Sequence, residues 1–289
     1  MEDSIKKADV LVEALPYIQA FSGKTIVVKY GGSALANPLV VHGILQDLVF
    51  LSVVGLRPVL LHGGGPLISQ RITASGKSTA FIEGMRVTDR ATMRIVNQAL
   101  EEVNTQLVEQ IRRLGGKALG IVARHQVILA KPHPSASRLG YVGQVRSVRV
   151  GSIRQVLKQP AIPVLSPVGH DHGQLFNINA DEVASYVATS LKAEKLVLLT
   201  NVRGILRQPG ELGSLIPTLS IKEARLLLER RVIQEGMIPK VNACIAALRQ
   251  GVVKTHIIDA TIPHALLLEI FTKRGIGTEI VRDDKPRRD

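Results

Sequence analysis

The sequence predicts an α/β protein with a mostly parallel central sheet. Short apolar runs rich in Val, Ile and Leu alternate with segments of helical periodicity from Lys24 to Val281, which is typical of a parallel sheet. Two of these runs lead directly into glycine-rich turns. Hydrophobic residues make up 45% of the 289 residues, which is enough to build a large core. In such a sheet we expect the active residues at the carboxyl ends of the strands.

Residues 4–20 have the spacing of an amphipathic helix, with apolar residues every three or four positions from Ile5 to Ile18. This helix precedes the first predicted core strand. The pattern therefore allows an arm that packs on another subunit, and it equally allows a helix that packs on its own domain.

The first glycine-rich turn follows the run Ile26-Val-Val28, which predicts a buried strand. Lys29 comes at the end of this strand, and Gly31-Gly32 follow. Glycine lets backbone N–H groups approach a ligand closely, and an ammonium group beside them favours anion binding. An ordinary Gly-Gly turn is the alternative. Neither G-x-G-x-x-G nor G-x-x-x-x-G-K-[ST] occurs here, so a phosphate at this turn would bind by another arrangement.

The second glycine-rich turn is Gly63-Gly-Gly-Pro66, and it follows the predicted strand Arg57–His62. A helix to about Ser75 should begin in this turn. Free amides at the positive end of a helix favour anions. A flexible turn is the alternative, but two strand–glycine–helix corners in one chain favour ligand binding.

The stretch Phe81–Asp89 predicts a hairpin that presents Arg86, a side chain suited to bidentate binding of a carboxylate. Asn177-Ile-Asn-Ala-Asp181 opens a helix, which either Asn179 or Asp181 could cap. The other predicted elements are helices at about 38–54, 89–113, 220–231, 240–250 and 263–272, strands at 117–122, 161–165, 195–200, 255–259 and 277–281, and an antiparallel β excursion at 126–150.

Composition excludes several classes of protein. The net charge is +13, but aromatic residues are only 3% of the chain and Trp is absent, which argues against a nucleic-acid surface built on base stacking. The longest apolar run, at 48–56, is too short to span a membrane. A lone Cys244 suits a reducing compartment. We therefore expect a cytoplasmic protein, or a stromal one if it is plastid-encoded, that binds neither nucleic acid nor membrane. We also expect no metal site built from its side chains.

Chemically active residues at the predicted strand ends are mostly cationic. They include Lys29, Lys240 and Arg86, with the acid Asp181. No pattern of paired carboxylates and no Ser–His–Asp array competes with them. Such a set can neutralise anions but contains no obvious proton abstractor, which fits phosphoryl transfer. A carboxylate acceptor is already ionised at neutral pH and would need no base.

Five motifs in order resemble those of the N-acetylglutamate kinases, of the amino acid kinase superfamily. The motifs are Val28–Gly32, Leu61–Pro66, Gly84–Asp89, Asn177–Asp181 and Gly236–Val241. The resemblance extends from about residue 10 to 282. It implies a three-layer αβα sandwich, the amino acid kinase fold, with an N-terminal helical arm. It also implies transfer of the ATP γ-phosphate to the γ-carboxylate of N-acetyl-L-glutamate, the second step of arginine biosynthesis.

The resemblance further implies a role for each matching residue. Lys29 and Lys240 would stabilise the transferring phosphoryl group, and Asp181 would orient the two lysines. Gly31, Gly32 and Lys240 would bind ATP, which would carry Mg²⁺. The acceptor would contact Gly64 and Gly65, with Arg86 and Asn177 at its α-carboxylate. Within one continuous sheet, residues 21–172 would form the acetylglutamate-binding and dimerisation lobe and residues 173–289 the ATP-binding lobe, after an arm at 1–20.

Two further features resemble the arginine-inhibited branch of these kinases. The arm ending in Glu13–Gln19 would link dimers into a hexamer. Arginine would bind near Leu266–Thr272, with His256 and Glu269 as candidate contacts. Members of this branch in cyanobacteria and plastids also bind the PII signalling protein, which is therefore a candidate partner.

Alternatives to an acetylglutamate kinase are a carbamate, aspartate or glutamate kinase of the same superfamily, or a non-catalytic protein that senses arginine or PII. The sequence departs from the usual pattern at four places. These are Asn201 in place of Asp, Glu101 and Glu235 in place of Gly, and Arg124-His125 in place of a Gly/Asp turn.

Overall fold

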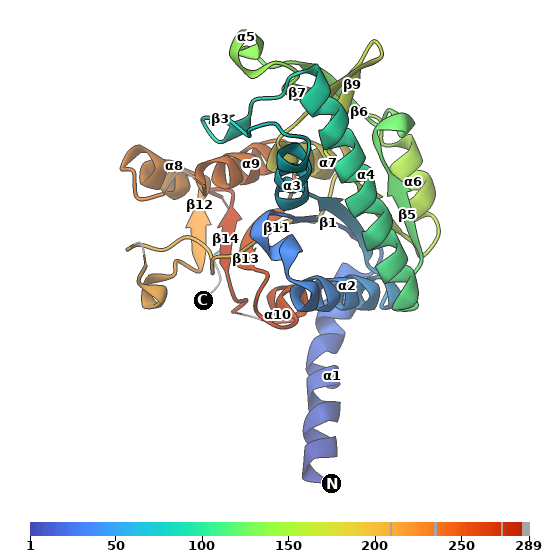
Figure 1. Ribbon diagram of the computed structural model, residues 1–289. Coiled ribbons are helices and arrows are strands. Elements are labelled where there is room, and N and C mark those ends of the chain that lie inside the picture. The colour runs from blue at the N-terminus through green and yellow to red at the C-terminus, as the bar shows by residue number, and fades with distance from the viewer. Residues whose placement is uncertain (209, 234–235, 273, 285–289) are drawn as a thin grey trace.

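Eight strands of the computed structural model form one central sheet, within the described residues 1–208, 210–233, 236–272 and 274–284 (Figure 1). For residues 2–4, 6–8, 10–11 and 33 only the backbone is described. In spatial order the strands are β12 (Thr218–Ser220), β14 (Thr278–Val281), β13 (Lys254–Asp259), β11 (Lys195–Thr200), β1 (Thr25–Tyr30), β2 (Arg57–His62), β8 (Ile162–Leu165) and β5 (Ala118–Ile121).

Strand directions confirm the predicted, mostly parallel sheet. From β13 to β5 all neighbouring strands are parallel, whereas β14 is antiparallel to β13. The reversal puts β14 and its parallel partner β12 at one side of the sheet, beyond the strands that carry the glycine-rich turns.

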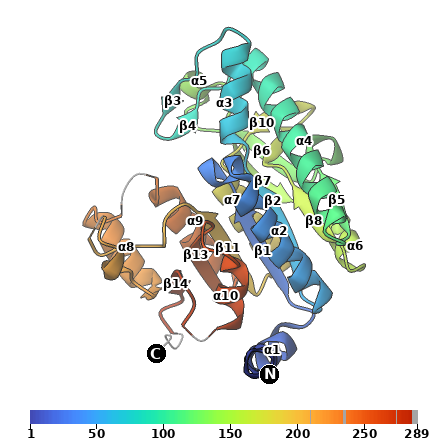
Figure 2. The same cartoon turned by 60° about the horizontal axis from the view of Figure 1, so that its bottom comes forward.

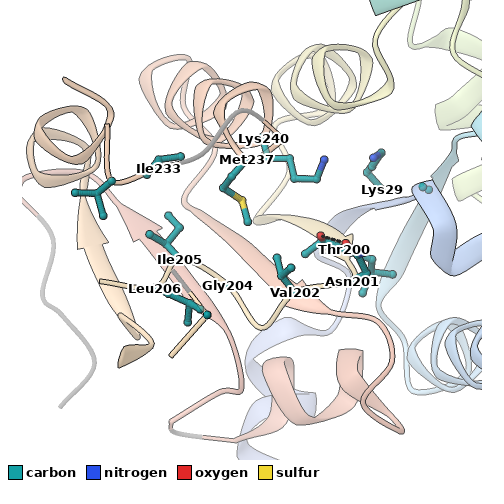
Figure 3. Close-up of a pocket in the computed structure, with 16 residues that line it drawn as sticks. Lys29, Thr200, Asn201, Val202, Gly204, Ile205, Leu206, Ile233, Met237 and Lys240 are labelled. Atoms are coloured by element: carbon teal, nitrogen blue, oxygen red, sulfur yellow. Dashed lines mark hydrogen bonds between the residues drawn. The ribbon is translucent and has the colours of Figure 1, made fainter. Parts of the chain in front are cut away.

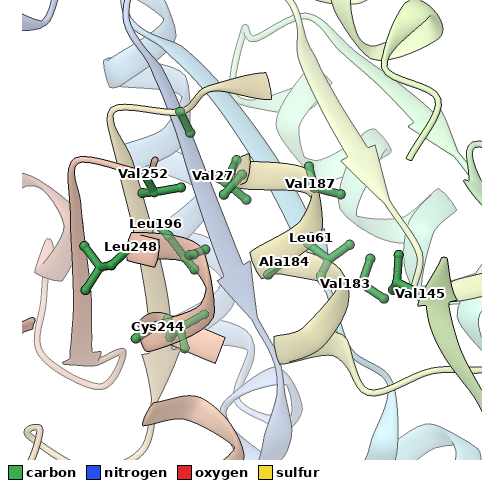
Figure 4. Close-up of a cluster of buried hydrophobic side chains, with 14 of the residues drawn as sticks. Val27, Leu61, Val145, Val183, Ala184, Val187, Leu196, Cys244, Leu248 and Val252 are labelled. Carbon is green, nitrogen blue, oxygen red and sulfur yellow. The ribbon is translucent and has the colours of Figure 1, made fainter. Parts of the chain in front are cut away.

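Both faces of the sheet are buried, because successive side chains of a strand point to opposite faces. Val27 belongs to one apolar cluster, whereas its neighbours Ile26 and Val28 belong to another. Figure 4 shows part of the first cluster, where Leu61 and Leu196 lie among helix side chains. This continuous burial explains why the strands consist of uninterrupted apolar runs.

Helices cover both faces and complete the predicted three-layer αβα sandwich (Figures 1 and 2). One layer contains α6 (Gly151–Leu157), α7 (Ala180–Leu191), α8 (Ile221–Glu229) and α9 (Ile238–Arg249). The other contains α2 (Pro38–Val53), α4 (Arg90–Arg113) and α10 (Ala265–Phe271). The shorter α3 (Gly65–Ala74) packs on α4 in a third cluster of buried side chains. No helix in the described part of the chain is long and apolar enough to cross a membrane.

A second sheet lies beside the main one. Its strands are β10 (Gln174–Asn177), β9 (Val168–Asp171), β6 (Ile128–Pro132) and β7 (Gly143–Val148). A separate two-stranded hairpin consists of β3 (Phe81–Ile82) and β4 (Met85–Arg86). The antiparallel pairing of β6 with β7 confirms the predicted excursion. The hairpin of β9 and β10 was not predicted, because its histidines, acid and glycine read as a loop. The remaining short elements are α5 (Ala136–Leu139), η1 (Gly32–Ala36), η2 (Ala123–His125) and η3 (Leu212–Ser214).

The N-terminal helix α1 (Glu2–Phe21) extends away from the body of the molecule (Figure 1). Tyr17, Ile18 and Phe21 in its last turns pack against the core of the body. Val12, by contrast, is 68% exposed, and Ile5 is also exposed. The helix thus uses its C-terminal end to attach to its own domain and leaves apolar side chains exposed along the projecting part.

Candidate active site

The two glycine-rich turns meet at the carboxyl edge of neighbouring parallel strands. Tyr30 at the end of β1 is paired with His62 at the end of β2, so both turns begin at the same level. A Cβ on Gly31 would come within 3.4 Å of the Gly63 Cα, and a Cβ on Gly63 within 3.3 Å of the Gly31 Cα. A side chain at position 63 would therefore crowd the backbone of the first corner, and one at position 31 would crowd the Lys29 ammonium, from which its Cβ would lie 3.2 Å.

Lys29, Asp181 and Lys240 form one buried ionic cluster at this edge. The Nζ of Lys29 lies 2.8 Å from Oδ1 of Asp181, and the Nζ of Lys240 lies 3.1 Å from Oδ2. The side chain of Lys29 is 8% exposed and that of Lys240 is 18% exposed. Because one carboxylate faces two ammonium groups, the cluster keeps an excess of positive charge.

Asp181 is held at the beginning of α7, where an acid interacts favourably with the helix dipole. Asn179 caps this helix by accepting from the backbone N–H groups of Asp181 and Glu182. Of the two candidate caps, Asn179 is therefore the one used, and the Asp181 carboxylate is free to bind the lysines. Burial alone would raise the pKa of Asp181, but the charges of Lys29 and Lys240 and their hydrogen bonds lower it below its usual value.

A cavity of about 350 Å³ opens beside this cluster (Figure 3). Lys29 and Lys240 extend toward each other at one side of it. Gly31, beside Lys29, and Gly32 also line the cavity. Apolar side chains such as Ile205 and Met237 line another part of it. A cationic end with an apolar remainder suits a ligand that joins phosphates to a flat organic group.

The second corner is a helix start. Gly64 is the N-cap of α3, and Pro66 lies in the first turn, as is common at this position. A Cβ on Gly64 would lie 2.7 Å from Cδ2 of Leu100, so a larger residue here would have to displace that side chain of α4. A Cβ on Gly65 would meet nothing within 4 Å. The N–H groups at this helix end make it a favourable site for an anion.

Arg86 lies beside the second corner rather than on an open surface. It is 7% exposed, and its guanidinium donates to Ser69 Oγ at 2.8 Å, Thr79 Oγ1 at 3.1 Å and the Gly65 carbonyl oxygen at 3.3 Å. The Phe81 ring packs against the guanidinium, with its centroid 4.7 Å from Cζ. These contacts orient the planar donor group next to Gly65.

Thr88 links Arg86 to Asn177, a connection that the sequence did not predict. The Thr88 hydroxyl donates to the Arg86 carbonyl at 2.7 Å, and Asn177 Nδ2 donates to the same hydroxyl oxygen at 3.3 Å. The structure thus brings the Arg86 hairpin and the end of β10 together. A Thr two residues after an Arg carries no signal of its own in a sequence, so only the fold could reveal this contact.

His256 and Glu269 lie in a separate buried cluster near the attachment of α1. His256 Nδ1 lies 2.7 Å from Glu269 Oε1, and both side chains are fully buried. The other oxygen of Glu269 accepts from the N–H groups of Ile276 and Gly277. The Lys195 ammonium lies 3.4 Å from His256 Nε2 and 4.9 Å from the centroid of the Phe21 ring in α1. The cluster therefore links strands β11 and β13 to the arm.

Three of the departures from the usual pattern fall on described residues. Asn201 lines the cavity beside Thr200. Glu101 and Arg124, each at one of the unusual positions, lie together, with Oε1 and Nη1 3.9 Å apart. Glu235 lies outside the described residues.

Cys244 is buried, and burial raises its pKa to about 12, so it is a core residue rather than a nucleophile.

Several known proteins are similar to this chain in sequence and in fold. The model of the amino acid kinase family matches residues 24–259. An acetylglutamate kinase of Desulforamulus reducens is 45% identical over 98% of this chain and 100% of its own length. An acetylglutamate kinase of Synechococcus elongatus is 49% identical over 94% of this chain and 91% of its own.

Among solved structures, the N-acetylglutamate synthase of Neisseria gonorrhoeae superposes with a TM-score of 0.86 at 29% identity. The match covers 96% of this chain and 64% of the synthase chain. That synthase was solved with coenzyme A and N-acetyl-glutamate, and also with coenzyme A and L-arginine. From the family model, the identity to full-length relatives and the shared fold, we conclude that the chain belongs to the amino acid kinase family, and within it to the acetylglutamate kinases.

Proposed function

We propose that this protein transfers the γ-phosphoryl group of ATP to the γ-carboxylate of N-acetyl-L-glutamate, a step of arginine biosynthesis. The products are ADP and an acyl phosphate. The bond between the γ-phosphorus and the β,γ-bridging oxygen breaks, and a bond from a carboxylate oxygen to phosphorus forms. The observation that carries the proposal is the pair of buried ammonium groups on Asp181, beside the first glycine corner, in a chain 45% identical to an acetylglutamate kinase.

Lys29 and Lys240 are proposed to stabilise the charge on the migrating group. Their shared carboxylate fixes both ammonium groups before substrate arrives, so little reorganisation is needed during the reaction. No base is required, because the acceptor is ionised at neutral pH. Asp181 therefore acts by orienting the lysines, and its lowered pKa keeps it charged in that role.

The cavity beside Lys240 is proposed to hold ATP, with the phosphates at Gly31 and Gly32 and the base among the apolar side chains. Mg²⁺ would arrive with the nucleotide and be held mainly by phosphate oxygens and water. Within the described residues no three His, Cys, Asp or Glu side chains gather around a possible ion. Because most of the residues that line the cavity come from this part of the chain, residues 173–289 form the proposed ATP-binding lobe.

N-acetyl-L-glutamate is proposed to bind on the other side of the lysine pair, within residues 21–172 and their junction with β10. The N–H groups of Gly64 and Gly65 would contact the acceptor. Arg86 offers the fork that suits the α-carboxylate, and Asn177 is linked through Thr88 to the main-chain carbonyl of Arg86.

Regulation by arginine is a further part of the proposal, at the cluster of His256 and Glu269. Glu269 is an acid near the attachment of α1, and the synthase of the same fold was solved with L-arginine. Because His256 and Glu269 are buried and bonded to each other, arginine would bind by rearranging this junction. Association with PII stays a prediction, as does a cytoplasmic or stromal location.

A coupled assay for ADP tests the function. With MgATP, the protein should turn over N-acetyl-L-glutamate in preference to carbamate, aspartate or glutamate, and L-arginine should lower the rate. Turnover of one of the other acceptors alone would overturn the substrate assignment. Arginine binding by calorimetry without any turnover would instead support a non-catalytic sensor.

Lys29→Ala and Lys240→Ala should each lower kcat roughly a hundredfold or more, since each removes a cation aimed at the developing charge. Lys158→Ala, at an exposed lysine just after α6, serves as a matched control and should retain most of the activity. Circular dichroism should show an intact fold for all three. Near-normal turnover in either site variant would contradict the mechanism.

Arg86→Ala should mainly raise the KM for N-acetyl-L-glutamate and change the KM for ATP little, because the lost fork binds the acceptor. Arg113→Ala, with an exposed side chain in the last turn of α4, is the control. Steady-state kinetics with each substrate varied in turn separates the two effects. A selective rise in the KM for ATP would show that Arg86 binds ATP and not the acceptor, and would contradict this assignment.

Deletion of residues 1–20 should reduce the size of the homo-oligomer, which we propose is a hexamer whose dimers are linked by the arm. The projecting part of α1 exposes Val12 and Leu15, and a second copy of the same helix would bury them. Light scattering measures the mass directly. An unchanged mass after the deletion would show that the arm does not hold the assembly together.

A further inference from the structure

A fully buried imidazole lies behind the second glycine corner, and the proposed mechanism does not use it. His62 is the last residue of β2 and is 0% exposed. Its Nδ1 lies 2.8 Å from the Gly63 carbonyl oxygen, and its Nε2 lies 3.1 Å from Nδ2 of Asn104. Asn104 comes from α4 and is itself 2% exposed, and its Nδ2 also donates to the Val164 carbonyl on β8 at 2.8 Å.

The proton positions in this chain of hydrogen bonds follow from its two ends. The Val164 carbonyl can only accept, so the group of Asn104 that faces it is the NH₂. The same NH₂ faces His62 Nε2, which must therefore carry the lone pair. The proton of a neutral imidazole is then on Nδ1, where it donates to the Gly63 carbonyl.

We propose that His62, held by Asn104 as the Nδ1–H tautomer, is a positioning residue that fixes the peptide between Gly63 and Gly64 for acceptor binding. This inference rests on the proposed function of the corner. The peptide is planar and trans, so its C=O and N–H point in opposite directions. Holding the Gly63 carbonyl toward His62 therefore aims the Gly64 N–H away from the core.

The corner is also constrained from its other side. The Gly63 N–H donates to the Tyr30 carbonyl at 2.8 Å, and Gly63 is in close contact with Gly31 of the first corner. A Cβ on Gly120 would come against Oδ1 of Asn104, so the strand beside the amide leaves room only for glycine. Burial lowers the pKa of His62 to about 4, although the bond to Gly63 opposes the shift, which agrees with a neutral ring.

Two substitutions separate the roles of the ring nitrogens. In His62→Asn the amide nitrogen can occupy the place of Nδ1 and keep the bond to Gly63, whereas in His62→Gln the amide reaches the place of Nε2 and that bond is lost. We expect kcat/KM for N-acetyl-L-glutamate to fall roughly tenfold or more in His62→Gln, and His62→Asn to recover most of the loss. Equal losses in the two variants would mean that His62 only fills space, and would overturn the inference.

A spectroscopic measurement on the wild-type chain tests the same inference without any assay. In protein labelled with ¹⁵N-histidine, the His62 signals are assigned by their absence from the His62→Gln spectrum, or from that of His62→Asn if the first variant does not fold. We expect a neutral ring with its proton on Nδ1. A proton on Nε2, or on both nitrogens, would overturn the inference. This readout is valid even if the protein does not phosphorylate N-acetyl-L-glutamate, so the two proposals can fail separately.

Discussion

The site depends on one carboxylate that binds two ammonium groups. Asp181 is contributed by α7, whereas Lys29 ends β1 and Lys240 lies in the first turn of α9. Removing Asp181 would leave two like charges close together in a place with little water, and neither lysine would then be held in position. With Asp181 present, the two lysines are held in position and the cluster keeps a net positive charge. Such a cluster can bind an anionic group, as the proposed phosphoryl transfer requires.

The parallel sheet brings these groups together. Its central strands all end at the same edge, so turns that are far apart in the chain become neighbours there. The contact between Gly31 and Gly63 sets how closely the two turns approach. Since both backbones are free of side chains at that point, the two turns can lie side by side, and the Gly63 N–H donates across them to the Tyr30 carbonyl at 2.8 Å.

Prediction from the sequence worked best for the main sheet. The strand Lys195–Thr200 was predicted with the bounds that it has, because a run of buried apolar residues has a strong local signal. The hairpin of β9 and β10 was missed, since His170, Asp171 and Gly173 are typical of loops. That hairpin is stabilised by pairing with β6, a contact between distant segments that leaves no local pattern.

By itself the sequence determined the α/β class, the two glycine corners and the placement of Lys29 at a strand end, because these depend on local composition and spacing, whereas Lys240, also expected at a strand end, lies in the first turn of α9. Only the tertiary structure decided that Asn179 caps α7 while Asp181 binds both lysines. It also decided that His62 is paired with Asn104, and that Arg86 reaches Gly65. Apart from the local Asn179 cap, each of these contacts joins elements from separate parts of the chain, and a hydrogen bond of that kind exists only after the core has packed the elements against one another.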